Sequence, residues 1–124
     1  VTYNKMNDLC QDIVWDNKGD TFMMSNKDKA VRLIDGRTGK DTAKMEKVHE
    51  GSKSCKLAYF GESGKFLTTG ASKSSGREVK VWDLKNLSQP LHTESVDTAS
   101  GALMPLYDQD TQVLFLCGKG DGII

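Results

Sequence analysis

Cys55 and His49 are the two residues whose types and spacing could most readily do chemistry in this chain. A thiol and an imidazole form a nucleophile and its general base when they lie within hydrogen-bonding reach. Cys55, however, begins the apolar run at 55–60, and a buried cysteine usually serves as inert packing. The sequence therefore favours a structural cysteine, and we predict that the protein is not an enzyme.

Two glycine-rich segments, GRTGKD at 36–41 and GESGKF at 61–66, have some features of a phosphate-binding loop. Both have too few residues between the glycines, and neither has Ser or Thr after the lysine to hold magnesium. The segment DQDTQ at 108–112 resembles the start of a calcium loop, but Val113 and Lys119 stand where glycine and glutamate are needed. The two histidines and three cysteines lack zinc-ligand spacing. We interpret the glycine segments as hairpin turns and expect no cofactor and no metal.

Length and composition indicate one ordinary soluble domain of 124 residues with 27% charged residues. The net charge of zero predicts no nucleic-acid partner, and the lack of a run of about 18 apolar residues predicts no membrane span. Cys10, Cys55 and Cys117 are odd in number and widely spaced, which favours a reducing, cytoplasmic setting. The opening segment at 1–10 has neither an apolar signal core nor an initiator Met, so we expect a piece of a longer chain.

Short apolar runs separated by Gly, Asp and Asn turns dominate the chain. They lie at 11–15, 21–25, 30–35 and 42–48, then at 55–60, 66–70, 77–83 and 91–96, and finally at 101–107 and 113–118. Turns at intervals of about 8–12 residues are typical of an antiparallel all-β meander. These runs are the elements that must position any functional side chain.

The runs repeat with a measurable period. Asp35 and Asp83 close equivalent strands 48 residues apart, and Asp28 and Asp121 lie in equivalent turns 93 residues apart over two repeats. A unit of about 40–50 residues with four strands and a Trp-Asp ending is the signature of a WD-repeat β-propeller. We predict an all-β chain in which residues 1–124 form part of such a propeller. The repeat units are expected at about 9–48, 49–96 and 97–124.

His49 stands in the turn before the inner strand of the second unit. A neutral imidazole there can bond a hydroxyl on one side and a carboxylate on the other, so we predict a link from His49 to Thr69 and Trp82. The alternative is a solvated loop histidine. Trp82 shares a strand with Val79 and Val81 that is apolar on both faces, which favours a packed residue over a surface binding anchor.

Four segments together resemble coronin, an actin-binding WD-repeat protein. The resemblance covers essentially the whole chain and is strongest in LTTG, DTASGALMP, YDQDT and CGKGD, which are more specific than a Trp-Asp ending. The segments lie at 14–40, 49–60, 66–91 and 97–122.

The resemblance implies a seven-bladed propeller, of which about two and a half blades from the middle are present, usually followed by a linker and a short coiled coil. It implies binding to filamentous actin in the cytoplasmic actin cytoskeleton, effects of the full-length protein on the actin-nucleating complex and cofilin, and no catalysis. Two positions depart from the repeat pattern. Ile34 replaces the Trp of the first unit, and Gly76 replaces the turn Asp of the second, which would leave the His-Thr-Trp set without its carboxylate.

The distribution of charge over the predicted loops indicates a binding face independently of the resemblance to coronin. The loops at 26–30, 47–56, 72–78, 94–100 and 118–122 would share one face and sum to about +2, whereas the turns at 16–20, 61–65 and 108–112 sum to about −3. The candidate actin contacts on the basic face are Lys27, Lys29, Lys53, Lys73, Arg77 and Lys119, and the predicted structural residues are Asp28, His49, Thr69, Trp82 and Asp121. Ordinary loop solvation, a scaffold for signalling or trafficking proteins, and a hydrolase site remain the alternatives.

Two and a half blades cannot close a propeller, so strand edges and apolar faces would remain open. We expect Phe66, Leu67, Leu114 and Phe115 to lie on uncovered faces, and the chain to associate with further copies or other chains that bury them.

Overall fold

The computed structural model describes Tyr3, residues 8–122 and Ile124. Within these residues all strand pairing is antiparallel, and three sheets follow one another along the chain. The first sheet, blade 1, contains β1 (Cys10–Trp15), β2 (Thr21–Asn26), β3 (Val31–Asp35) and β4 (Asp41–Met45) in that order. Blade 2 contains β5 (Leu57–Tyr59), β6 (Lys65–Ala71), β7 (Arg77–Asp83) and β8 (His92–Asp97). Blade 3 is the hairpin of β9 (Leu103–Asp108) and β10 (Val113–Gly118).

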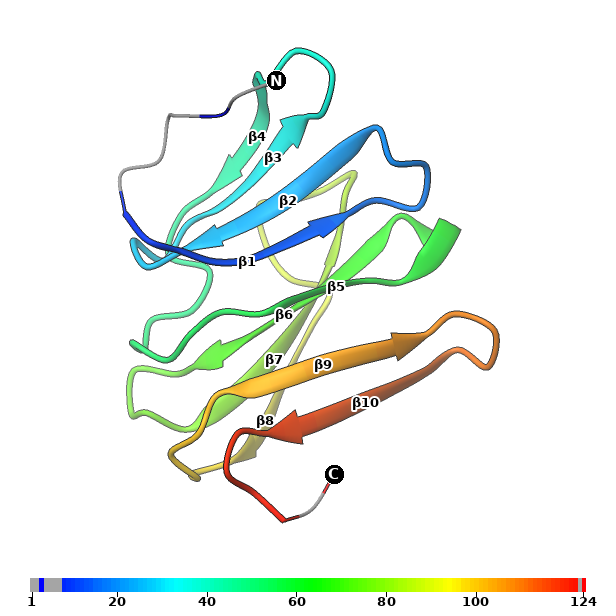
Figure 1. Ribbon diagram of the computed structural model, residues 1–124. Helices are drawn as coiled ribbons and strands as arrows, with labels where there is room; N and C mark the ends of the chain where they lie inside the picture. Colours follow the sequence, from blue (N-terminus) through cyan, green and yellow to red (C-terminus); the bar gives the residue numbers. More distant parts are fainter. Residues whose placement is uncertain (1–2, 4–7, 123) are drawn as a thin grey trace.

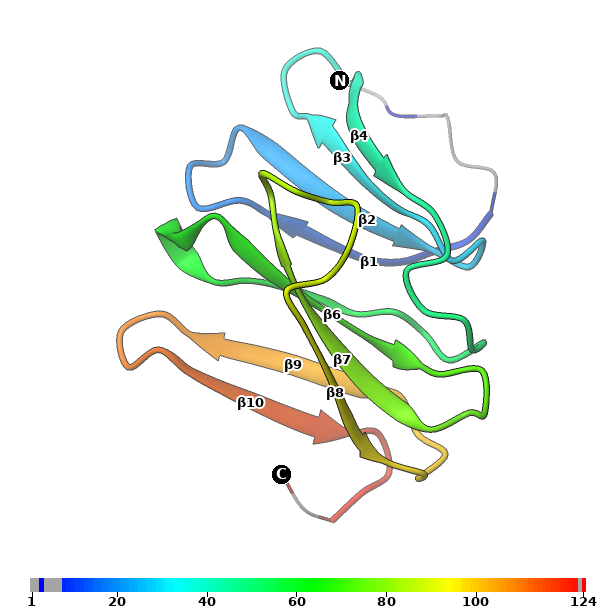
Figure 2. The ribbon, with the colours of Figure 1, turned by 180° about the vertical axis from the view of Figure 1, so that it is seen from behind.

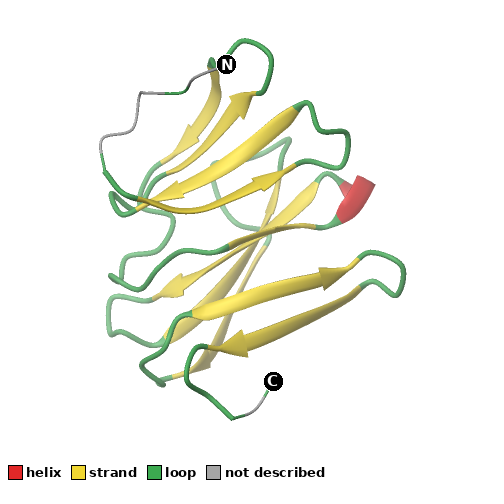
Figure 3. Ribbon diagram, in the orientation of Figure 1, coloured by secondary structure: helices red, strands yellow, loops and turns green. Residues whose placement is uncertain are grey.

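The three blades stack face to face, with blade 2 between the other two (Figure 1, and from behind in Figure 2). Figure 3 shows that strands and loops make up almost all of the described chain; its short helix is the 3-10 turn η1 (Gly61–Ser63). No helix in the described part of the chain is long and apolar enough to cross a membrane. The all-β meander predicted from the turn spacing is confirmed.

The two glycine-rich segments at 36–41 and 61–66, which have some features of a phosphate-binding loop, form turns. In the β3–β4 turn the Asp35 carboxylate accepts hydrogen bonds from the backbone N–H groups of Arg37 and Thr38, and Gly39 takes a φ of 66° that favours glycine. In the β5–β6 turn Gly64 ends η1 in the left-handed region with a φ of 72°. In the first segment the backbone N–H groups of residues 36–40 all donate within the turn or to Asp20, so they are not free for a ligand.

Equivalent positions in blades 1 and 2 follow from the strand register. Phe22 pairs with Ile34 in blade 1, one step from the strand ends, and Phe66 pairs with Trp82 at the same place in blade 2. Ile34 therefore does occupy the position of the Trp, as the repeat comparison predicted. Counting two residues along β2 and β6 places Met24 and Thr68 at equivalent positions on the same face of their blades.

The main core lies between blades 1 and 2. Met23 and Leu33 from blade 1 pack against Phe66 and Trp82 from blade 2, whose rings are nearly parallel with centroids 6.4 Å apart. A second, smaller core between blades 2 and 3 contains Leu67, Val79 and Leu103, with Leu114 packed against it.

The prediction that Phe66 and Leu67 would be uncovered is wrong. Their exposed fractions are 0% and 1%, because blade 1 covers one face of blade 2 and blade 3 covers the other. Phe115 is 43% exposed and lies on the outer face of blade 3. Leu106 pairs with it in the hairpin register and is 65% exposed, so this outer face is apolar and open to solvent.

Candidate partner-binding face

Loops from all three blades gather at one end of the molecule, at the left of Figure 1. We call this surface the loop face; it consists of residues 27–30, 46–56, 72–76, 98–102 and 119–122. The first-to-second-strand turns gather at the opposite end, which we call the turn face; it consists of residues 16–20, 60–64 and 109–112. Across the turn face, the Gln109 amide donates to the Asn17 side-chain carbonyl, and the Asn17 amide donates to Glu62, each at 3.3 Å.

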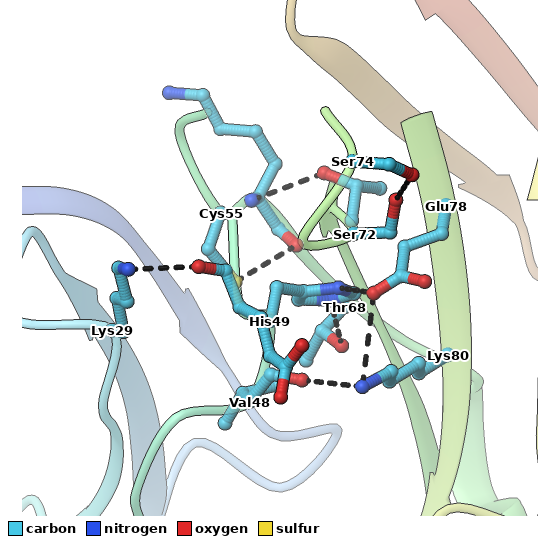
Figure 4. Close-up of polar contacts among 12 residues, drawn as sticks. Lys29, Val48, His49, Cys55, Thr68, Ser72, Ser74, Glu78 and Lys80 are labelled. Atoms are coloured by element: carbon cyan, nitrogen blue, oxygen red, sulfur yellow. Dashed lines mark hydrogen bonds and ion pairs between the residues drawn. The ribbon is translucent and has the colours of Figure 1, made fainter. Parts of the chain in front are cut away.

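Five predicted contact lysines lie on the loop face but differ in their surroundings. Lys27, Lys73 and Lys119 are exposed, and their ammonium groups make no hydrogen bond or ion pair within the described residues. The Lys29 ammonium donates to the backbone carbonyl of Glu50 at 2.8 Å (Figure 4), and the Lys53 ammonium donates to that of Ser75. These two lysines are held in place, while the other three extend into solvent.

Arg77 is not available for a partner, contrary to the sequence prediction. Its side chain is 3% exposed, and its guanidinium donates two hydrogen bonds of 2.6 Å to Asp97 and one of 2.7 Å to Asp121. A further N–H donates to the carbonyl of Gly101 at 3.3 Å. The guanidinium lowers the pKa of Asp97 to about 2 through these hydrogen bonds. Arg77 therefore ties blade 2 to the loops that lead into and out of blade 3.

The two aspartates predicted to lie in equivalent turns pair with different arginines. Asp121 follows β10 and reaches Arg77 of the neighbouring blade. Asp28 lies in the β2–β3 turn and pairs with Arg32 of its own blade at 2.7 Å. The hydrogen bond from Arg32 lowers the pKa of Asp28, and the same guanidinium donates to the Asn26 side-chain carbonyl at 2.8 Å.

Behind the loop face, a chain of side-chain hydrogen bonds crosses blade 2; Figure 4 shows its part from Thr68 through His49 and Glu78 to Lys80. The Trp82 indole N–H donates to Thr68 Oγ1 at 3.0 Å, and Thr68 Oγ1 lies 2.8 Å from His49 Nε2. His49 Nδ1 lies 2.9 Å from a Glu78 carboxylate oxygen. The Lys80 ammonium lies 3.7 Å from that oxygen and donates to a backbone carbonyl at 2.8 Å.

The network requires one arrangement of protons. The carboxylate of Glu78 accepts, so His49 Nδ1 carries the proton, and His49 Nε2 accepts from the Thr68 hydroxyl. Burial lowers the pKa of His49 from its ordinary 6.5, even though the hydrogen bond to Glu78 acts in the opposite direction. The imidazole is therefore neutral at pH 7 and joins the loop before blade 2 to two of its strands.

Two details of the predicted network are wrong. The hydroxyl belongs to Thr68, because residues separated by two share a strand face and Trp82 pairs with Phe66. Thr69 points to the other face, where its hydroxyl donates to the carbonyl of Leu103 at 3.0 Å. The missing carboxylate is present after all, supplied by Glu78 of β7 rather than by the turn at Gly76.

Gly70 makes room for the histidine. A Cβ atom at this position would lie 2.4 Å from Cγ of the His49 ring and 2.8 Å from its Cβ. The imidazole thus packs directly on the β6 backbone, which only glycine permits. The sequence signal for this contact was the glycine that follows the two threonines in LTTG.

Cys55 and His49 do not form a reactive pair. Burial raises the pKa of the Cys55 thiol to about 12, so the thiolate is not formed at neutral pH. Both ring nitrogens of His49 are already engaged by Thr68 and Glu78. Within the described residues, no group of three His, Cys, Asp or Glu side chains is placed to hold a metal ion.

Stacked four-stranded antiparallel blades with a buried Trp-Thr-His-carboxylate network define part of a WD-repeat β-propeller. Among solved structures, the chain is similar to the WD40 domain of coronin from Toxoplasma gondii, with a TM-score of 0.89 and 33% identity. The match covers 95% of this chain and 31% of that one. The predicted resemblance to coronin is confirmed, and the chain spans about a third of the length of that coronin structure.

Two further structures show the fold alone. U3-55K and the WD40 repeats of RRP9 each match with a TM-score of 0.66 at 12% identity over 81% of this chain. The match covers 30% of the former and 29% of the latter. No protein-family model matches the chain.

Proposed function

We propose that this chain is part of a coronin-type propeller that binds filamentous actin and regulates the organisation and turnover of actin filaments. The observation that carries the proposal is the similarity to the coronin WD40 domain, at 33% identity over 95% of the chain. The proposal places the protein in the cytoplasm at the actin cytoskeleton. It leaves the actin-nucleating complex and cofilin as partners of the full-length protein, with no part for nucleic acid or a membrane span.

The distribution of charge supports the loop face as the contact surface. Lys27, Lys73 and Lys119 extend from it, whereas the turn face carries acidic residues such as Glu62 and Asp110. A neutral chain polarised in this way orients an acidic partner toward its basic end and accelerates association.

Co-sedimentation of the full-length protein with actin filaments tests the proposal. The variant Lys27→Glu/Lys73→Glu should bind several-fold more weakly at low salt, and the difference should shrink as salt rises because exposed charges are screened over about 10 Å at 0.1 M. Lys18→Glu/Lys85→Glu, at exposed positions off the loop face, is the matched control. Equal binding of all three proteins at every ionic strength would remove the loop face from this role. Absence of filament binding would favour a scaffold for other proteins.

We further propose that the outer face of blade 3 packs against another sheet. Its exposed apolar side chains come from both strands of the hairpin, and Leu106 pairs directly with Phe115. They are Met104, Leu106, Val113 and Phe115. Exposed apolar surface of this kind favours association, so the isolated 124-residue chain should form larger species. A cooperatively melting monomer at high concentration in a sedimentation experiment would contradict this.

A further inference from the structure

A pocket of about 220 Å³ opens on the loop face where blades 1 and 2 meet. Lys27 and Lys29 from the β2–β3 turn line one side, and Lys53 from the loop between the blades lines the other. His49 and Cys55 lie at its buried end. We call this the seam pocket.

The lining carries three positive charges and no acidic side chain. Asp28 lies between the two lysines in sequence, but its carboxylate is paired with Arg32 at 2.7 Å. Glu50 is exposed and does not line the pocket, and its backbone carbonyl accepts the hydrogen bond from Lys29.

Within the described residues none of the three lysines of the pocket forms an ion pair, although the charge of Lys53 contributes to the lowered pKa of Asp97. The Glu78 carboxylate behind the pocket is shared between His49 and Lys80. The lining itself therefore stays positive, and a partly enclosed site strengthens its effect.

The ammonium donors of the pocket suit a carboxylate, and two of its backbone N–H groups are not available to bind a phosphate. Tetrahedral phosphate sites usually present converging backbone N–H groups. Here the N–H of Val48 donates to the carbonyl of Lys29 and that of Gly51 donates to Ala71, so both are already used. The ammonium groups of Lys29 and Lys53 each use one donor on a backbone carbonyl and retain others for a ligand.

We propose that the seam pocket binds the carboxylate of a Glu or Asp side chain presented by an acidic segment of a protein partner. The inference rests on the proposed function, because the actin filament is the partner in which it is tested. Lys29 and Lys53, which are held by the backbone carbonyls of Glu50 and Ser75, donate hydrogen bonds to the carboxylate. Lys27 adds a third positive charge to the pocket.

Carbodiimide cross-linking of the full-length protein to filaments tests this directly, since it joins a lysine amine to a carboxylate in contact with it. Cross-links from Lys27, Lys29 or Lys53 to acidic residues of the filament, mapped by mass spectrometry, would support the pocket. Lys85 is the control, being exposed and outside the pocket. Cross-links from Lys85 equal to those from the pocket lysines would overturn it.

A second arm does not depend on filaments. An acetylated triglutamate peptide should bind the full-length protein weakly, and Lys27→Gln/Lys53→Gln should reduce the affinity about fivefold or more, while Lys85→Gln leaves it unchanged. Peptide binding without filament binding would refute the proposed function and keep the pocket. Filament binding without peptide binding or pocket cross-links would refute the pocket and keep the function. Tighter binding of inorganic phosphate than of the peptide would overturn the carboxylate assignment.

Discussion

Blades 1 and 2 have the same strand order and equivalent registers, yet they hold their middle strands with different chemistry. Blade 2 uses the neutral hydrogen-bonded chain from Trp82 through Thr68 to His49. At the positions of Trp82 and Thr68, blade 1 has the apolar Ile34 and Met24, with exposed fractions of 0% and 2%.

Blade 1 compensates with an ion pair. Arg32 is 2% exposed and binds both Asp28 and Asn26, so the β2–β3 turn is held to its strand by charge. Blade 2 has Lys80 at the same position as Arg32, and that lysine donates instead to the loop before the blade. Both blades therefore have a buried polar tie near the loop face, but its chemical type differs between them.

Other ties are the same in the two blades. The Ser25 hydroxyl donates to the carbonyl of Cys55 at 2.7 Å, and the Thr69 hydroxyl donates to that of Leu103 at 3.0 Å. Each joins the middle strand of one blade to the segment that begins the next. This hydroxyl contact between blades is thus repeated, whereas Asp121 bonds the neighbouring blade and its equivalent, Asp28, pairs within its own.

The substitution Gly70→Ala should have the largest effect on this comparison. The new methyl group would occupy the space of the His49 ring, so blade 2 should lose about 2–3 kcal/mol through overpacking while blade 1 changes little. Hydrogen exchange resolved by blade measures the difference. Gly76→Ala is the control, because its nearest contact would be 3.4 Å away and its cost should be small. Similar losses for both variants would show that the histidine contact is not special.

Arg32→Met should affect blade 1 in the reciprocal way. Removing the guanidinium leaves the buried Asn26 side-chain carbonyl without its Arg32 donor and leaves Asp28 with the backbone N–H of Ala30, which should cost about 2 kcal/mol. Lys44→Met removes an exposed ion pair from the same blade and should cost well under about 1 kcal/mol. Thermal unfolding and blade-resolved exchange would reveal the order; an equal cost for the two variants would contradict the buried tie.

Thr68→Val and Thr69→Val separate the two faces of β6. Thr68→Val leaves the Trp82 indole N–H and a His49 nitrogen without a partner, at a cost of about 1–2 kcal/mol. The nuclear magnetic resonance signals of the His49 ring should therefore change in Thr68→Val. Thr69→Val should leave those signals unchanged and instead reduce exchange protection of the Lys56 amide, whose N–H donates to the Thr69 hydroxyl at 3.1 Å. A shift of the His49 signals in Thr69→Val alone would reverse our assignment.

Lowering the pH to mildly acidic values should destabilise blade 2 more than blade 1, and this is the smallest effect that we predict. Because burial lowers the pKa of His49, its contribution to stability is complete above the ordinary value of 6.5 and is lost as the pH falls below it. The pKa of Asp28 is lowered from 3.8, so the tie in blade 1 remains intact until the pH falls below that value. Between pH 7 and pH 5, exchange protection should fall in blade 2 and hold in blade 1. Parallel losses in the two blades would contradict this.

The strands and turns could be predicted because Gly, Asp and Asn mark every turn between short apolar runs. The link between His49 and Trp82 could be predicted from residue types, but the threonine whose hydroxyl joins them could not. Choosing Thr68 over Thr69 requires the register of β6 against β7, which is a tertiary property.

Two predictions failed because they assumed that charge or hydrophobicity alone determines exposure. Arg77 looked like a surface charge, yet Asp97 and Asp121 come from distant segments and bury it. Phe66 looked like part of an open face, yet blade 1 covers it fully. Both outcomes depend on how blades stack, which local sequence does not report.

Electron cryo-microscopy of actin filaments decorated with the full-length protein tests the central claim most directly. Our account predicts that the loop face, with the turns at 27–30 and 72–76, lies against the filament and that acidic side chains of the filament approach its lysines. A reconstruction in which the turn face lies against the filament, with the loop face exposed to solvent, would contradict it.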